Sequence, residues 1–137
     1  MISANIKMEF KSKVEKVWDV VTNNEDYQWR SDVKCLEIIN DEEFIEHTES
    51  DFETHFIITK KEYCKQYEFD LQNKNMKGHW TSTFEKTPQG CVVVFTEVVE
   101  VRNMVMKLMA KPYLKKQQRK YRDDLYKKLQ EETEDAN

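Results

Sequence analysis

The C-terminal quarter of the chain, from Arg102 to about residue 132, constrains the fold most strongly. It contains no glycine, and its apolar residues recur mostly three or four positions apart, at Val105, Leu108, Met109, Tyr113, Tyr121, Leu125 and Leu129. This spacing predicts a long α-helix with one apolar face. At 1.5 Å per residue the helix would be roughly 45 Å long. Such a helix needs a large apolar surface to pack against, and the rest of the chain has to supply it.

The first residues alternate strictly between apolar and polar side chains, which predicts a β-strand with one buried face over residues 2–11. The period changes at Ser12, which forms a capping-box pattern with Glu15. A short amphipathic helix is predicted to follow and to end near Asn23 and Asn24. A second helical turn is predicted over residues 25–30.

Six further strands are predicted downstream, because β-branched and aromatic runs alternate with turns rich in Asn, Asp, Pro and Gly. They cover residues 33–39, 44–48, 54–60, 64–72, 76–85 and 91–101. Short connections make neighbouring strands antiparallel. The predicted fold class is α+β: one domain, residues 1–137, in which about seven antiparallel strands wrap around the long C-terminal helix, with two short helices between strands 1 and 2. We expect the functional site to lie in the space between the sheet and the long helix.

The composition argues against several classes of protein. The chain has three widely spaced cysteines, Cys35, Cys64 and Cys91, and no Cys-x-x-Cys pair. This pattern argues against a disulfide framework or a zinc site, and it indicates a cytoplasmic location. No apolar run approaches the ~20 residues of a membrane-spanning helix, so no integral membrane association is expected. The histidines lack metal-ligand spacing, and only Gly78 and Gly90 are glycines, so neither a metal nor a phosphate-binding cofactor is predicted.

Charge is distributed unevenly along the chain. Residues 1–101 carry 12 basic and 20 acidic side chains, whereas residues 102–132 carry 10 basic and 4 acidic ones. From Lys107 to Arg122 there are seven basic residues and no acidic one. One interpretation is a stripe for nucleic acid or an anionic membrane. The favoured interpretation is a solvated face that complements an acidic body, because aromatic residues do not interleave with the basic ones. No nucleic-acid partner is therefore predicted.

Pro112 lies inside the predicted long helix. Proline removes one helical hydrogen bond and clashes with the preceding turn, so a kink is expected near residues 108–112. The kink would separate a methionine-rich segment, residues 103–111, from a docked segment, residues 113–130. We expect the first to line or gate a cavity and the second to hold the fold together.

Several local patterns together resemble a known superfamily. They are Val-Trp-Asp-Val-Val-Thr-Asn at residues 17–23, Trp-Arg-Ser-Asp-Val at 29–33, Gly-His-Trp at 78–80 followed by Phe84, Phe-Thr-Glu at 95–97, and Pro112. The chain resembles the START-like or SRPBCC superfamily, which includes polyketide cyclase/dehydrase and lipid-transport-like proteins and the birch-pollen allergens. The resemblance implies a helix-grip fold with a cavity between the sheet and the last helix. Members bind lipids, hormones or polyketides, some catalyse cyclisation, and others regulate chaperones, so fold leaves function open.

Side-chain alternation along the strands predicts which residues face the helix. Large aromatic and apolar side chains at inward positions would form a cavity wall suited to an apolar ligand, although plain core packing is the alternative. Met104, Met106 and Met109 could form its mouth, or fill the core. The predicted ligand-binding residues are Trp29, Leu36, Ile38, Phe56, Ile58, Tyr67, Phe69, Trp80, Phe95, Glu97, Met109 and Tyr113.

Glu97 and Glu46 are the candidate catalytic residues, provided that each faces inward with Phe95 and Phe44. A carboxyl group in an apolar cavity has a raised pKa and can act as a general acid or base. The alternatives are an outward orientation, or pairing with Arg30, Arg102 or a tyrosine.

Three functions follow from these observations. The first, which the sequence favours, is binding of a small hydrophobic or amphipathic molecule without catalysis. The second is an enzyme of the cyclase or hydratase type, in which Tyr67 or Tyr113 donates a hydrogen bond. The third is a protein-interaction module, similar to a chaperone co-regulator, that presents its basic helix to an acidic partner. The sequence leaves the oligomeric state open.

Overall fold

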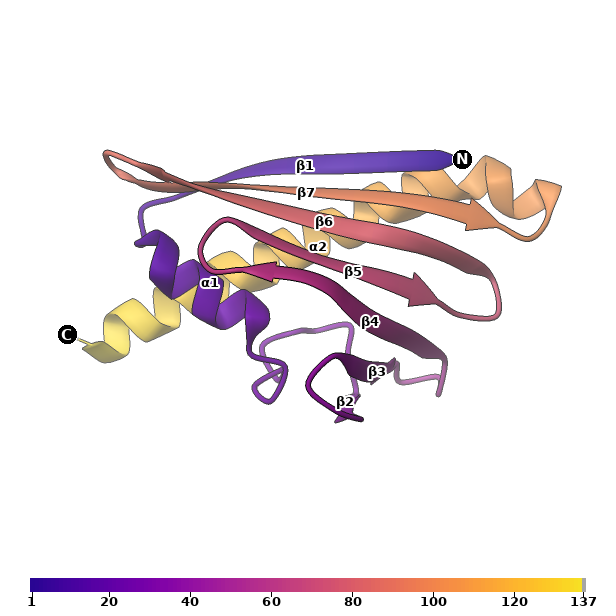
Figure 1. Ribbon diagram of the computed structural model, residues 1–137, viewed down its shortest axis with the longest axis horizontal. Helices are drawn as coiled ribbons and strands as arrows, with labels where there is room; N and C mark the ends of the chain where they lie inside the picture. The colour runs from indigo at the N-terminus through magenta and orange to yellow at the C-terminus, as the bar shows by residue number, and fades with distance from the viewer. Residues whose placement is uncertain (137) are drawn as a thin grey trace.

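Within the described part of the chain, seven strands form one antiparallel sheet in the computed structural model, and a long helix crosses one face of it (Figure 1). The structure describes the backbone of residues 1–136 and the side chains of residues 1–131. The sheet order is β1-β7-β6-β5-β4-β3-β2, so the first strand pairs with the last and the others form a meander. The strands are β1 Ile2–Phe10, β2 Cys35–Ile38, β3 Glu43–His47, β4 Glu53–Glu62, β5 Gln66–Gln72, β6 Met76–Thr87 and β7 Gly90–Val101; the helices are α1 Val14–Thr22 and α2 Met104–Ala136.

This architecture confirms the predicted α+β helix-grip fold, but the second helical turn predicted over residues 25–30 is wrong. Residues 23–34 form a loop of turns instead, in which the Arg30 amide donates to the Tyr27 carbonyl over 2.9 Å. The loop is anchored to α2, because the backbone amide and hydroxyl of Ser31 both donate to Asp124 Oδ2, at 2.9 and 2.8 Å. These tertiary contacts outweigh the local helix propensity.

Two smaller sequence predictions are also wrong. The N-cap of α1 is Lys13 rather than Ser12, and no side chain caps the helix; the Lys13 carbonyl accepts from the amides of Lys16 and Val17. The strand predicted to begin at residue 64 begins at Gln66. Cys64 lies in the turn before it, with a left-handed φ of 59° that a strand does not accommodate.

Strand alternation gives the sheet a continuous inner face. Inward-facing partners align from strand to strand, as in the row Phe44, Phe56, Leu71, Gly78 and Val99. Gly78 has room for no side chain, because an added Cβ would lie 2.4 Å from the Val98 carbonyl oxygen and 2.7 Å from Val99 Cγ1. The conditional prediction that Glu97 faces inward with Phe95 agrees with the burial pattern of β7.

The hydrophobic core is densest at one end of the molecule. There α1, β1, β6, β7 and the C-terminal half of α2 bury a cluster that includes Met8, Val17, Trp18, Phe95 and Leu125. Smaller clusters lie around Leu114 and around the Phe44–Phe56 pair. The core is therefore divided, and the space between its parts is where α2 lies over the middle strands.

α2 packs through a stripe that the sequence only partly predicts. Its buried residues are Ala110, Leu114, Gln118, Leu125 and Leu129, each four or seven positions after the previous one. The Gln118 Nε2 group donates to the Ala4 carbonyl over 2.9 Å, which ties α2 to β1. The helix continues through Pro112, and a kink there stays a prediction.

The first two turns of α2 differ from the rest of the helix. Met104, Val105, Leu108 and Met109 are exposed, Leu108 to 81%. The prediction that Val105, Leu108 and Met109 belong to the packing face is therefore wrong. Despite these apolar residues, none of the described helices is both long and apolar enough to cross a membrane.

Candidate functional site

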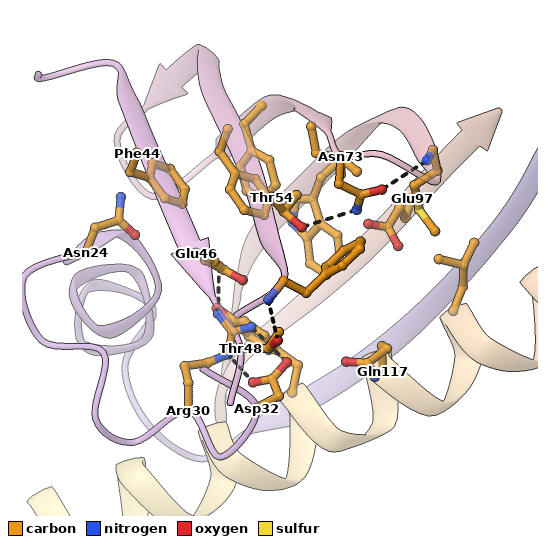
Figure 2. Close-up of a pocket in the computed structure, with 18 of the residues that line it drawn as sticks. Asn24, Arg30, Asp32, Phe44, Glu46, Thr48, Thr54, Asn73, Glu97 and Gln117 are labelled. Atoms are coloured by element: carbon orange, nitrogen blue, oxygen red, sulfur yellow. Dashed lines mark hydrogen bonds and ion pairs between the residues drawn. The ribbon is translucent and has the colours of Figure 1, made fainter. Parts of the chain in front are cut away.

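A cavity of about 220 Å³ lies between the inner face of the sheet and α2. Figure 2 shows how β-strands, the 23–34 loop and α2 all contribute side chains to it. Its apolar lining consists of Val21, Phe44, Phe52, Phe56, Tyr67, Phe69, Leu71, Met76, Trp80, Tyr113, Leu114 and Tyr121. Its polar lining consists of Asn24, Arg30, Asp32, Glu46, Thr48, Thr54, Asn73, Glu97 and Gln117.

Aromatic rings form one wall of the cavity. Phe44 and Phe56 stack with centroids 4.8 Å apart, and Phe69 meets Phe56 edge-on at 5.1 Å. Phe69 also stacks on Trp80 at 5.7 Å with planes 5° apart. These residues come from β3, β4, β5 and β6, and alternation places all four rings on the inner face. The wall offers a rigid apolar surface for a ligand.

Arg30 organises a charged cluster at the edge of this wall. Its Nε and Nη2 atoms each lie 3.2 Å from an oxygen of Asp32, and its Nη1 lies 3.4 Å from Glu46 Oε2. The guanidinium also lies 4.6 Å from the Tyr121 ring centroid. Burial alone would lower the pKa of Arg30, but the charges of Glu46 and Asp32 outweigh burial and raise it. The arginine is a fully engaged cation that holds the 23–34 loop against β3.

Glu46 and Glu97 therefore differ in their surroundings. Burial raises the pKa of Glu46, while the neighbouring Arg30 opposes the increase. Glu97, on β7, has no hydrogen-bond or ion-pair partner among the described side chains. Burial, together with the charge of Glu46, raises the pKa of Glu97 to about 7. Its carboxyl group can hence take up or release a proton, or accept a hydrogen bond from a ligand, near neutral pH.

Tyrosine hydroxyl groups complete the polar lining. Asn24 Nδ2 lies 3.4 Å from the Tyr67 hydroxyl and donates to it. Burial raises the pKa of Tyr67 and of Tyr113, so both hydroxyls are neutral donors at physiological pH. In residues 1–131 no three His, Cys, Asp or Glu side chains are grouped so that they could hold a metal ion.

A second, wider hollow of about 640 Å³ adjoins the cavity, and we call it the vestibule. The two share the lining residues Thr48, Phe52, Asn73, Met76 and Tyr113. The start of α2 supplies its outer wall through Met106, Met109, Ala110, Pro112 and Lys116. The vestibule therefore lies between the cavity and the exposed first turns of α2.

Six of the predicted ligand-binding residues line the cavity: Phe56, Tyr67, Phe69, Trp80, Glu97 and Tyr113. Glu46, the other candidate carboxylate, lines it as well. The alternative that a carboxylate pairs with Arg30 holds for Glu46 and not for Glu97.

The other six predicted residues lie elsewhere. Phe95 is fully buried behind Trp80 and Tyr121, and Trp29 packs edge-on against Tyr121. Ile58 and Leu36 pack in the core clusters. Ile38 faces the same side as Phe44 but is 46% exposed, because its strand is the outer edge of the sheet. Met109 lines the vestibule rather than the cavity.

The ligand-binding residues predicted from the sequence omit lining residues from strands, from loops and from α2. Alternation along β3 and β4 gives Phe44 and Thr54 the same orientation as Phe56, so strand parity could have found them. Asn24 and Asp32 lie in the irregular loop, where no periodicity indicates orientation. Gln117 could be assigned to the cavity only if it were known which stripe of α2 faces the sheet.

Comparisons with known structures agree with this architecture. A conserved protein from Geobacillus kaustophilus superposes with a TM-score of 0.82 at 14% identity, covering 95% of this chain and 96% of that one. A START superfamily protein from Mycobacterium smegmatis gives 0.66 at 20% identity over 99% and 98% of the two chains. DynU16, a protein in the dynemicin biosynthetic locus, gives 0.76 at 11% identity and covers 93% of this chain but 47% of that one.

The family is identified by comparing the sequence with family models. No curated protein has a matching sequence. Residues 1–132 match the family model described as polyketide cyclase/dehydrase and lipid transport. The START-like fold, the cavity under α2 and this match over nearly the whole chain agree: the protein belongs to the polyketide cyclase/dehydrase and lipid transport family of the SRPBCC superfamily.

Proposed function

We propose that the protein binds a small amphipathic molecule in the cavity between the sheet and α2. The family's fold is one that binds hydrophobic ligands. The observation that carries the proposal is the pairing of a rigid aromatic wall with Glu97, a carboxyl group that has no partner among the described residues. The wall favours an apolar body, and the carboxyl group favours a polar substituent at one end of it.

The charges around the cavity define that substituent. Arg30 is already engaged by Asp32 and Glu46, so it is not available to pair with an anionic ligand. Among the charged lining residues Glu97 remains, and ionised Glu97 accepts hydrogen bonds only. A hydroxyl, amide or amine on the ligand would satisfy it, whereas a carboxylate or phosphate would meet like charge.

The cavity volume limits the ligand's size. About 220 Å³ is below the ~300–1,000 Å³ of common small-molecule sites. A compact ligand fits the cavity alone, and a longer one would extend past Met76 and Tyr113 into the vestibule. We place this binding function in the cytoplasm, a location supported by the three cysteines, each of which is a free thiol.

The experiment is a titration with N-phenyl-1-naphthylamine, an uncharged aromatic amine whose emission rises in apolar surroundings. We expect saturable binding to the wild type and loss of binding in Gln117→Trp, which fills the cavity from α2. Gln130→Trp, at an exposed position on the same helix, is the matched control and should bind like the wild type. Equal binding by all three proteins would place the dye outside the cavity and contradict the proposal.

A second candidate function is acid–base catalysis, which the unpaired Glu97 specifically favours. A pKa of about 7 suits a group that transfers protons at neutral pH, and Tyr113, which has a hydroxyl group, also lines the cavity. One structural neighbour, DynU16, lies in a biosynthetic locus, which supports this candidate. Binding alone and catalysis can be distinguished by the mass of any molecule that co-purifies with the Glu97→Gln variant. A mass that differs from the molecule held by the wild type indicates an accumulated substrate, and an identical mass indicates binding alone.

A further inference from the structure

The first turns of α2 expose an apolar surface at one end of the molecule. Met104, Val105, Leu108 and Met109 are between 65% and 81% exposed, and they are the densest group of exposed large apolar residues in the described chain. Positions 104 and 108, 105 and 108, and 105 and 109 are three or four residues apart, so the four residues lie on one side of the helix. Figure 1 shows this part of α2 beyond the ends of the strands, away from the main core. We call these four residues the apolar tip.

Basic residues continue from the apolar tip along the same helix. Lys107 and Lys111 flank the tip, and Lys115, Lys116 and Arg119 follow on the exposed side of the next turns. No acidic residue interrupts the sequence from Lys107 to Arg122. The buried residues Ala110, Leu114 and Gln118 face the opposite way, toward the sheet. The exposed side of α2 is therefore apolar at its start and cationic immediately afterwards.

We propose that this surface docks the protein reversibly on an anionic lipid membrane. The apolar tip would enter the boundary between headgroups and acyl chains, and the basic residues would lie against anionic headgroups. Each Lys or Arg close to an anionic surface strengthens the attraction. The proposed contact is peripheral, and none of the helices in the described residues is long and apolar enough to cross a bilayer.

Charge also decides between a membrane and other occupants of this surface. A second copy meeting it symmetrically would bring two uninterrupted basic stripes together, which opposes a homodimer through this face. A nucleic acid would bind the basic residues, but it would have no favourable contact for the four exposed aliphatic and thioether side chains of the apolar tip. An anionic bilayer complements both parts.

The rest of the molecule sets the orientation of docking. The vestibule lies beside the apolar tip, since Met109 belongs to both. The opposite rim of the vestibule is the turn between β3 and β4, where Glu49 is exposed and Asp51 pairs with Lys34 over 3.6 Å. That rim has no uninterrupted basic stripe like that of α2, so the molecule would contact the membrane through the start of α2, with the vestibule opening beside it.

The experiment is co-sedimentation with vesicles of phosphatidylcholine alone or of phosphatidylcholine containing 30% phosphatidylglycerol. We expect binding to the anionic vesicles only, and loss of most of it when the salt concentration is raised. Leu108→Glu should abolish binding, whereas Ile39→Glu, at an exposed isoleucine away from α2, should not. The pair Lys115→Gln/Arg119→Gln should weaken binding about tenfold or more, and Lys60→Gln/Lys61→Gln on β4 should leave it unchanged.

Several results would overturn the proposal. They are equal binding to neutral vesicles, binding that Leu108→Glu leaves intact, or no binding to either vesicle. A concentration-dependent dimer that Leu108→Glu dissociates, in the absence of vesicle binding, would assign the surface to a second copy. Binding of an RNA oligonucleotide in place of vesicles would assign it to nucleic acid. None of these variants touches the cavity, so dye binding reports folding and tests the ligand site separately.

Discussion

Glu97 is the residue whose chemistry depends most on its position in the fold. Its pKa is raised from 4.5 to about 7, mainly by burial, so the folded protein holds a proton there that the unfolded chain releases. Stability contributed by this protonation is present below pH 4.5 and is lost as the pH rises to about 7. Above that, ionised Glu97 costs up to about 3 kcal/mol.

The first prediction follows from this linkage. Glu97→Gln cannot ionise, so it should be more stable than the wild type at pH 8, by up to about 3 kcal/mol, and nearly equal to it at pH 4. Urea unfolding of both proteins at the two pH values gives the comparison. A stability difference that does not change with pH would show that Glu97 keeps an ordinary pKa.

The second prediction concerns Arg30. Arg30→Gln would leave the half-buried carboxylates of Glu46 and Asp32 without their cation, and it should cost about 1–3 kcal/mol of unfolding free energy. Arg102→Gln is the matched control at an exposed arginine and should change stability by less than about 0.5 kcal/mol. Urea denaturation measures both. If the two substitutions cost the same, the Arg30 cluster does not hold the loop in place.

At the residue scale, the sequence could predict which way a strand side chain points but not which side chain it pairs with. Alternation along β7 places Glu97 on the same side as Phe95, and the structure agrees. The pairing of Arg30 with Glu46 joins an irregular loop to a strand 16 residues away, and no local pattern encodes it. Loop residues such as Asn24 therefore could not be assigned to the site.

Among the elements, α2 combines two roles along its length. Its later turns hold Leu125, fully buried against α1 and the sheet, while Leu108 in its first turns contacts little. The third prediction is that Leu125→Ala costs about 2–5 kcal/mol and Leu108→Ala less than about 0.5 kcal/mol. Thermal or urea unfolding of the two variants makes the comparison. Similar losses would contradict the division of α2 into an anchored and an exposed part.

α2 also shows why the spacing of apolar residues was not enough to predict the buried side of a helix. The apolar residues have helical spacing throughout, but the stripe that meets the sheet contains Gln118 and Ala110 rather than Leu108 and Met109. A polar glutamine is tolerated there because its side-chain amide donates to the Ala4 carbonyl. Hydropathy gives the period of a helix, whereas the neighbouring backbone decides which side is buried.

At the scale of the whole molecule, the cavity exists because the core is divided. The large cluster around Phe95 and Leu125 lies at one end, and the Phe44–Phe56 pair lies on the outer strands. α2 bridges the interval, with Gln117 facing the gap. The order of elements was enough to predict a space under α2. Its volume and polar lining depend on long-range packing, which the sequence does not display.

The claim that this space holds a ligand is tested most directly by native mass spectrometry of freshly purified protein, before and after incubation with an extract of the producing cells. We predict that the wild type and Gln130→Trp carry a bound small molecule, and that Gln117→Trp, with its cavity filled, has the mass of the polypeptide alone. A wild type that shows only the polypeptide mass under both conditions would contradict the account.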